Sequence, residues 1–300
     1  MTFVDLESAS RQNDFRYGTL PFYKSEKPFK ISGAGKTTEP LWGMSMLAAG
    51  SMRFRWNESN PNRDSFLSEL CARYGQKEVC PIELIHSKTV FVARAADDTF
   101  NLRGDGIITQ NKNLVPVVTA ADCLPLYFYD SKTGAFGAAH SGWKGTGIAA
   151  RVVEAMANEY GSKPSDILVA IGPHIHDCCY TVDVERAKYF SDNFGSDCVT
   201  AFRVQDAEGA DKKAFQGQEE RGRTSKEESC ALSLLRANVN CLLKAGVLEQ
   251  NIVAAKNCTA CGARFGSFRR QAAALDVPQE QKSRLFTTQA AFVIIQENEN

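Results

Sequence analysis

The alternation of hydrophobic and polar positions predicts mainly strands through the middle of the chain. Short runs rich in β-branched and aromatic residues, bounded by turn residues, are typical of strands. Nine runs of this kind are found: Val79–Ile85, Thr89–Ala93, Gly106–Thr109, Leu114–Thr119, Leu124–Tyr129, Phe136–Ala139, Asp166–Ile171, Asn251–Ala255 and Ala291–Gln296. Between two of them, Asp-Ser-Lys-Thr-Gly at residues 130–134 indicates a hairpin turn.

Three other segments place apolar residues at helical spacing. They are Asn62–Tyr74, Thr146–Tyr160 and Ala231–Ala245, and the first two are followed by Gly75 and Gly161, which are natural helix ends. Strands outnumber helices, and their order favours an α+β sandwich in a single domain.

Two stretches depart from this pattern. Residues 1–50 are rich in Gly, Lys, Pro and Ser, and we expect an N-terminal extension of loops and short strands before a domain of residues 51–300. Gln205–Glu228 is charged and small, with almost no large apolar residue, which predicts a mobile surface segment without catalytic groups.

Charge and composition limit the function classes. Lys plus Arg and Asp plus Glu number 35 each, so no global field favours nucleic acid or an anionic membrane. No apolar run approaches a membrane span, and the N-terminus lacks the pattern of a signal peptide. With ten cysteines and no export signal, we expect reduced thiols and a cytoplasmic location.

The candidate chemistry centres on one cysteine and two histidines. Cys123, His140 and His86 each lie at the end of an apolar run, and the chain has only four histidines. Taken singly, each could be a packed core residue. Because they are far apart in sequence, only the fold could bring them together, and a His₂Cys set that leaves one coordination position open suits a catalytic zinc ion.

The segment after His140 has the features of an anion-binding turn. Ser141–Gly147, with sequence Ser-Gly-Trp-Lys-Gly-Thr-Gly, precedes a predicted helix, whose free N–H groups attract phosphate. Lys144 adds a full charge, and Ser141, Arg63 and Arg269 are the further candidates for phosphate or substrate binding.

Three other motifs carry less weight. Ser32–Thr37 looks like a phosphate-binding P-loop but lacks its first glycine, and Pro40 blocks the helix that such a loop needs. Cys258 and Cys261 form a lone Cys-x-x-Cys, which does not support a zinc ribbon. The cluster of His174, His176, Cys178 and Cys179 could be a second metal site, although a turn near the first site is favoured.

Together the motifs resemble the multicopper polyphenol oxidoreductase (laccase-like) family, also called peptidoglycan editing factor and regarded as purine nucleoside phosphorylases. The motifs that carry the resemblance begin with His-Ser-Lys-Thr-Val at His86, Gly-Asp-Gly-Ile-Ile-Thr at residues 104–109 and Thr-Ala-Ala-Asp-Cys-Leu-Pro at residues 119–125. They continue with Ala-Ala-His-Ser-Gly-Trp-Lys-Gly-Thr at residues 138–146, Ile-Gly-Pro-His-Ile-His-Asp-Cys-Cys-Tyr at residues 171–180, and a closing Cys-Thr and Phe-Gly-Ser-Phe-Arg-Arg. The chain departs from the family pattern at Thr181, where a glutamate is usual, and at Ser87, where a glycine is usual.

The resemblance implies a four-layer α/β/β/α sandwich with mixed sheets, in which the counterparts of His86, Cys123 and His140 bind a catalytic zinc ion. It also implies a zinc-dependent purine nucleoside phosphorylase that acts on adenosine, inosine or methylthioadenosine with phosphate, and that has adenosine deaminase activity. The implied partners are therefore a small-molecule nucleoside and phosphate, not nucleic acid or a membrane, and the protein is a monomer or a homodimer.

Three alternatives remain open at this point. A His₂Cys set also binds copper, so a copper polyphenol oxidase is possible, although four histidines are too few for a trinuclear copper cluster. Cys123 and His140 could act as nucleophile and base in a hydrolase of peptidoglycan fragments. Zinc could also merely brace a binding protein without activity.

Overall fold

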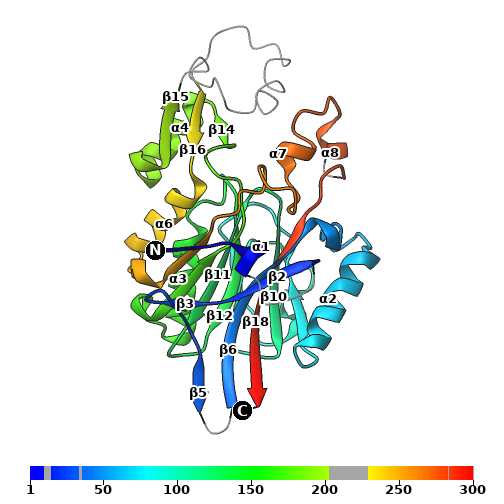
Figure 1. Ribbon diagram of the computed structural model, residues 1–300, viewed down its shortest axis with the longest axis vertical. Coiled ribbons are helices and arrows are strands. Elements are labelled where there is room, and N and C mark those ends of the chain that lie inside the picture. Colours follow the sequence, from blue (N-terminus) through cyan, green and yellow to red (C-terminus); the bar gives the residue numbers. More distant parts are fainter. Residues whose placement is uncertain (10–14, 34–35, 203–228, 283, 300) are drawn as a thin grey trace.

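Two mixed sheets packed face to face form the centre of the molecule (Figure 1). The structure is a computed structural model, and it describes residues 1–9, 15–33, 36–202, 229–282 and 284–299. The seven-stranded sheet has the order β1 (Thr2–Val4), β17 (Ile252–Ala255), β13 (Ile167–Ile171), β11 (Leu124–Asp130), β12 (Phe136–Ser141), β9 (Gly106–Thr109) and β8 (Val90–Val92). The six-stranded sheet has the order β2 (Tyr17–Pro21), β6 (Lys36–Ser45), β18 (Gln289–Glu299), β10 (Leu114–Ala120) and β7 (Glu78–Pro81), with β5 (Ile31–Gly33) also paired to β6.

Helices cover the outer face of each sheet. The seven-stranded sheet is covered by α3 (Ile148–Tyr160), α4 (Val184–Phe194) and α6 (Leu234–Lys244), and the six-stranded sheet by α2 (Pro61–Arg73). These groups of helices lie on opposite sides of the two sheets in Figure 1. The expected α/β/β/α sandwich with mixed sheets is therefore confirmed.

Three hydrophobic cores fill the spaces between these four layers. Because successive side chains of a strand point to opposite faces of its sheet, one strand contributes to two of these cores. In β11, Leu126 and Phe128 pack under α3, whereas Tyr127 and Tyr129 point between the two sheets. In β18, Val293 likewise faces the space between the sheets, while its neighbours belong to the core under α2.

Smaller elements lie around this sandwich. A three-stranded sheet is formed by β14 (Thr181–Val182), β16 (Ser229–Leu232) and β15 (Val199–Phe202), and β3 (Tyr23–Lys24) pairs with β4 (Lys27–Pro28). The short helices are α1 (Leu6–Ala9), α7 (Phe268–Gln271) and α8 (Gln279–Lys282). Among the described residues, none of the helices is long and apolar enough to span a bilayer.

The first fifty residues contribute to both large sheets. β1 runs parallel to β17 at the edge of the seven-stranded sheet, while β6 pairs over most of its length with β18. A domain boundary near residue 50 stays a prediction, but in this fold the first strands share their hydrogen bonds with the last ones.

Local chemistry explains where the elements differ from the predicted ones. The helix expected from Thr146 begins at Ile148, because Gly147 adopts a left-handed conformation with φ of +101°. The helix expected from Ala231 begins at Leu234, since Ser233 caps it by accepting a hydrogen bond from the backbone of Arg236. The predicted segment Gln205–Glu228 lies outside the described residues.

Candidate metal and active site

His86, Cys123 and His140 converge at one end of the two central sheets. His86 lies in the loop between β7 and β8, Cys123 lies in the turn that connects β10 with β11, and His140 lies in β12. Their ligand atoms, one sulfur and two imidazole nitrogens, all lie within 4.8 Å of one another. The two imidazole rings stand edge to face, with their centroids 4.9 Å apart. Three residues far apart in sequence are therefore brought together by the fold.

A buried carboxylate holds the loop that carries His86. Asp105, fully buried, accepts hydrogen bonds from the backbone N–H groups of His86 at 2.9 Å and Ser87 at 2.5 Å, and from the Ser87 hydroxyl at 2.7 Å. His86 has a positive φ of +59°, an unusual conformation for this residue type that these bonds maintain. Ser87, where the family usually has glycine, thus takes part in the support of the loop.

One imidazole nitrogen of the site lacks a hydrogen-bond partner. His140 is buried, and its Nδ1 lies 2.8 Å from the backbone oxygen of Thr119, to which it donates. This bond leaves Nε2 with a free lone pair, and Nε2 is buried without a partner. A metal-binding histidine has this arrangement, with one ring nitrogen fixed by a carbonyl and the other bound to the ion.

The surroundings lower the pKa of the two histidines, which favours metal binding, and raise the pKa of Cys123. Desolvation by the surrounding protein lowers the pKa of the partly exposed His86, and burial together with the neighbouring His86 lowers the pKa of His140 to about 4. Both imidazoles are therefore neutral near pH 7, as ligands must be. Burial, then the charges of Asp122 and Asp105, raise the pKa of the Cys123 thiol to about 12. Cys123 needs a neighbouring cation to ionise at neutral pH.

The three residues fit a zinc ion. A tetrahedral zinc ion with bonds of about 2.0–2.3 Å holds its ligand atoms roughly 3.3–3.8 Å apart, so only a small contraction of this group is needed. Gly142 leaves the necessary room, because a Cβ atom there would meet Cys123 Sγ and His86 Cδ2 at 3.0 Å each. His86 is exposed whereas His140 is buried, so the site is approached from the side of His86.

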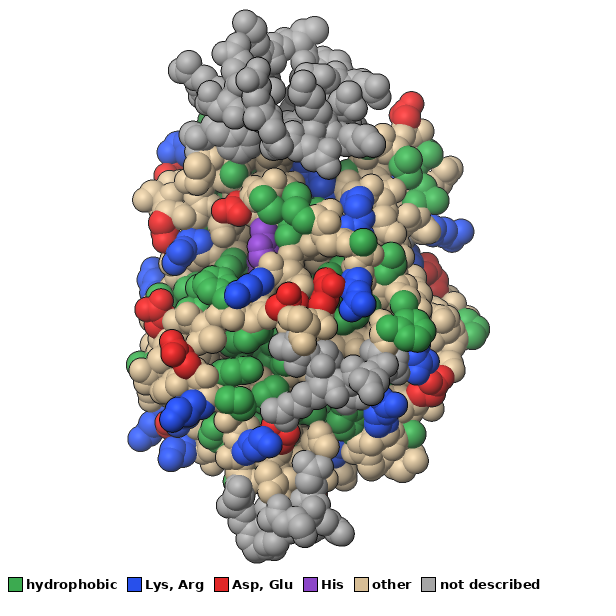
Figure 2. Space-filling view, viewed as in Figure 1, with side chains coloured by type: hydrophobic (Ala, Val, Ile, Leu, Met, Phe, Trp, Pro, Cys, Tyr) green, Lys and Arg blue, Asp and Glu red, His purple; other side chains and the backbone are tan. Residues whose placement is uncertain are grey.

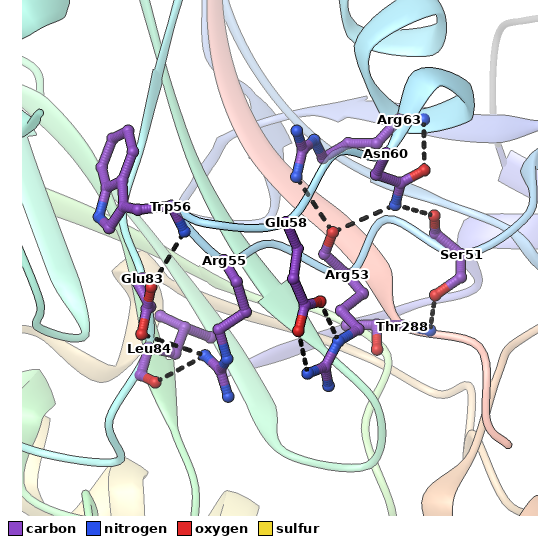
Figure 3. A network of polar contacts seen from close by, with 10 residues as sticks. All are labelled: Ser51, Arg53, Arg55, Trp56, Glu58, Asn60, Arg63, Glu83, Leu84 and Thr288. Atoms are coloured by element: carbon purple, nitrogen blue, oxygen red, sulfur yellow. Dashed lines mark hydrogen bonds and ion pairs between the residues drawn. The ribbon is translucent and has the colours of Figure 1, made fainter. Parts of the chain in front are cut away.

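Basic side chains surround the His86 side of the site. The positive charges of Arg55 and Lys144 both contribute to lowering the pKa of His86. Lys144 is exposed, and its Nζ lies 5.3 Å from the centre of the Trp143 ring. Arg55 donates to the backbone oxygen of Leu84 at 3.2 Å, two residues before His86 (Figure 3). These charges are suited to an anionic substrate.

The other predicted phosphate ligands make structural contacts. Arg63 donates to Asp64 and to the backbone oxygen of Arg53, at the start of α2 (Figure 3). Ser141 points to the opposite face of β12 from His140, and its buried hydroxyl donates to Asn238 of α6 at 2.9 Å. A phosphate-binding role for the side chains of Arg63 and Ser141 stays a prediction.

Arg269 lies on the Cys123 side. Its backbone N–H donates to Asp122 Oδ2 at 2.6 Å, and Asp122 directly precedes Cys123. Its guanidinium donates to two neutral oxygens of Thr181 and lies 5.7 Å from the centre of the Tyr180 ring. Thr181 thus offers Arg269 neutral oxygens rather than a carboxylate.

Sequence reasoning missed the supporting groups Arg55, Asp105 and Asp122. Arg55 lies in a stretch without helical or strand periodicity, so no pattern marked it. The two aspartates stand inside the motifs at residues 104–109 and 119–125, which was a signal, but their role depends on which backbone N–H groups the fold brings to them.

A separate cavity of about 180 Å³ lies elsewhere, against His174, His176 and Asp177. His86, Cys123 and His140 do not line it, so ligand geometry rather than cavity size locates the candidate active site.

The fold and the site define the class of protein: a two-sheet sandwich that carries at one end a His₂Cys group able to hold a metal ion. Within it, the chain belongs to the multi-copper polyphenol oxidoreductase laccase family, whose profile matches residues 57–275.

Relatives of known sequence have more specific names. The purine nucleoside phosphorylase YlmD of Geobacillus stearothermophilus is 35% identical over 169 residues, which are 55% of this chain and 54% of that protein. The human purine nucleoside phosphorylase LACC1 is 38% identical over 124 residues, 40% of this chain and 28% of that protein. A protein from an unknown prokaryote named adenosine deaminase RL5 is 31% identical over 159 residues, 52% of this chain and 53% of that protein. The alignments thus span from about a quarter to about half of each of these relatives.

Solved structures agree on the fold. The crystal structure of YlmD from Geobacillus stearothermophilus has a TM-score of 0.66 with 24% identity, and covers 89% of this chain and 98% of that one. The Bacillus licheniformis hypothetical protein YfiH gives the same TM-score at 21% identity, covering 88% of this chain and 98% of that one.

Proposed function

We propose that this protein is a zinc-dependent purine nucleoside phosphorylase that also deaminates adenosine. Its substrates would be adenosine, inosine or methylthioadenosine together with phosphate. The names of the relatives support this reaction class. The observation that carries the proposal is the convergence of His86, Cys123 and His140, with the unpartnered Nε2 of His140 directed into the group.

In phosphorolysis, the bond between the ribose C1′ and the purine nitrogen breaks and a bond from C1′ to a phosphate oxygen forms. The departing base takes up a proton. The cationic side chains Lys144, Arg55 and Arg269 would bind and orient the phosphate, since they flank the two sides of the site. Lys144 is exposed and free to approach an incoming anion.

In deamination, the amino group at purine C6 is replaced by oxygen from water and leaves as ammonia. His86, Cys123 and His140 would hold the zinc ion, and the chemistry that zinc would supply is the activation of water as a nucleophile near neutral pH. Desolvation keeps both imidazoles neutral, Asp105 holds the backbone of His86, and the Thr119 carbonyl orients the ring of His140.

The thiol pKa of Cys123 and the number of histidines argue against the other reaction classes. A nucleophilic Cys123 would need a lowered thiol pKa, but burial and two carboxylates raise the pKa to about 12. A laccase needs a trinuclear copper cluster, and only His174 and His176 remain after His86 and His140 are assigned. We therefore propose zinc rather than copper as the ion of this site.

The direct test is to incubate the purified protein with adenosine, inosine or methylthioadenosine, with and without phosphate, and to follow adenine, hypoxanthine and inosine. Release of free base that depends on phosphate is expected. His140→Ala should remove one zinc equivalent and lower kcat/KM by more than about 100-fold, because even residues behind metal ligands cost about 10–100-fold. Base release without phosphate, or full activity in His140→Ala, would contradict the proposal.

A second test concerns the phosphate. Lys144→Ala should raise the KM for phosphate at least about tenfold, since a hydrogen bond to a charged group contributes about 1.5–3 kcal/mol. Lys163→Ala, an exposed lysine beyond the far end of α3, is the matched control and should leave that KM unchanged. An unchanged KM in Lys144→Ala would remove Lys144 from the phosphate site.

A further inference from the structure

Four cysteines from two distant loops meet at a second place in the molecule. Cys178 and Cys179 lie in the loop between β13 and β14, and Cys258 and Cys261 lie in the loop after β17, about 80 residues later. The four sulfur atoms all lie within 4.8 Å of one another. The Cys-x-x-Cys pair and the Cys-Cys pair are separate motifs in the sequence, and only the fold shows that they lie together.

The distances between the sulfur atoms match a tetrahedron around one ion. Cys178 Sγ lies 3.8 Å from Cys179 Sγ, 3.8 Å from Cys258 Sγ and 3.6 Å from Cys261 Sγ, while Cys179 and Cys261 are 3.2 Å apart. Zinc–sulfur bonds of about 2.3 Å place tetrahedral ligands about 3.8 Å apart. A disulfide instead requires one pair at about 2.05 Å, and the remaining two sulfurs would then have no role.

Packing does not explain the cluster. Cysteine is usually buried when it serves only as a small apolar residue. Here Cys178 and Cys261 are exposed and Cys179 is half-buried, and only Cys258 is buried. The backbone N–H of His176 donates to Cys258 Sγ at 3.4 Å, the type of contact that orients and stabilises a metal-bound thiolate.

We infer that Cys178, Cys179, Cys258 and Cys261 bind a second zinc ion, separate from the ion proposed for His86, Cys123 and His140. Four thiolate ligands leave no position open, so this ion would have a structural role. The inference does not depend on the proposed function, because it shares no ligand with the first site.

Hydrogen bonds connect the four-cysteine cluster to Asp122, the residue next to Cys123 of the first site. Thr259, next to Cys258, donates through its hydroxyl to Asp122 Oδ1 at 2.7 Å, and Asp122 precedes Cys123. Arg270 of α7 donates to the backbone oxygen of Thr259 at 2.6 Å, and the adjacent Arg269 is bound to Asp122. The second ion would thus hold the loop that supports Asp122 and α7.

Zinc content measured on the full chain tests the inference. The wild type should contain two zinc ions per chain, while His140→Ala and Cys261→Ser should each contain one. Cys241→Ser, which changes a half-buried cysteine of α6 outside the cluster, is the matched control and should keep two. Equal zinc content in the wild type and in Cys261→Ser, or iron in place of the second zinc, would overturn the inference.

Alkylation of the wild-type protein gives a readout that does not depend on whether a variant folds. Exposed Cys178 and Cys261 should resist iodoacetamide in the purified protein and become labelled, as peptide mapping would show, once a chelator is added without reductant. Labelling before the chelator, or only after a reductant, would identify free thiols or a disulfide and refute the zinc site.

Discussion

At the scale of single residues, the proposed zinc site of His86, Cys123 and His140 depends on its neighbours as well as on its ligands. The neighbours must let the three side chains come close together. Gly142 lies so near Cys123 and His86 that the proposed zinc site requires a residue without a side chain at this position. His86 in turn keeps a left-handed backbone only because Asp105 binds two successive N–H groups of its loop. Gly142 and Asp105 therefore set the geometry of the proposed zinc site, although neither is a ligand in it.

Gly142→Ala should therefore weaken zinc binding. A Cβ atom 3.0 Å from both Cys123 Sγ and His86 Cδ2 must displace a ligand, and displacing a ligand should reduce affinity by at least about tenfold. Competition with a chromophoric chelator would measure the change. Gly75→Ala is the control: its Cβ meets nothing within 4 Å, but its φ of +93° should cost about 1 kcal/mol of stability without changing zinc affinity. Equal zinc affinity in the two variants would contradict this account.

At the scale of elements, successive side chains of β12 point to opposite faces of the sheet. One face carries the proposed active site and the other contributes to stability. His140 points toward the space between the sheets, where it donates to Thr119, while the next residue, Ser141, points toward α6. Adjacent residues of one strand thus belong to the proposed metal site and to a helix contact.

Ser141→Ala should lower stability more than it affects catalysis. The change leaves the buried Oδ1 of Asn238 without its hydroxyl donor, which costs about 1–3 kcal/mol in the free energy of unfolding. Urea unfolding would measure this loss, and the double variant Ser141→Ala/Asn238→Leu should recover part of it, because neither partner is then left unsatisfied. A raised KM for phosphate in Ser141→Ala would instead place this hydroxyl in the substrate site.

The elements also show what sequence can and cannot predict. Strands such as β9 and β13 and the helix α2 were predicted to within a residue or two, because their periodicity and end signals are local. The convergence of His86, Cys123 and His140 was predicted from their positions at strand ends and from the family resemblance, and it is observed, while their role as zinc ligands stays a prediction. The four-cysteine cluster was not, since Cys178 and Cys258 are 80 residues apart and no local pattern shows that their loops meet.

At the scale of the whole molecule, buried histidines couple stability to pH. Burial, then the neighbouring His176, lower the pKa of His174 to about 3, and His140 is lowered to about 4. An unfolded histidine has a pKa of about 6.5. Below that pH the unfolded chain takes up protons that the folded protein does not, so stability is lost as the pH falls from about 6.5 toward these lower values.

His174→Gln should reduce this acid sensitivity. Between pH 7 and pH 5, a histidine that stays neutral in the folded state costs about 2 kcal/mol of stability. Urea unfolding at the two pH values, with equal zinc, should therefore show a loss that is smaller by about 2 kcal/mol in the variant than in the wild type. An identical loss in both proteins would mean that His174 is not the group that titrates.

Surface charge at this scale is mixed. On the face shown in Figure 2, basic and acidic side chains are interspersed, in keeping with 35 residues of each sign, so attraction of phosphate has to come from the cations at the site itself.

The position of β18 has a consequence for synthesis. It lies between β6 and β10 and pairs Ala291 with Met44 and Val118. Until the ribosome has delivered that strand, the halves of the six-stranded sheet present two unpaired edges to other nascent chains. Premature termination before residue 289 would therefore leave a sheet split along its middle, a product for chaperones and proteases rather than a shortened enzyme.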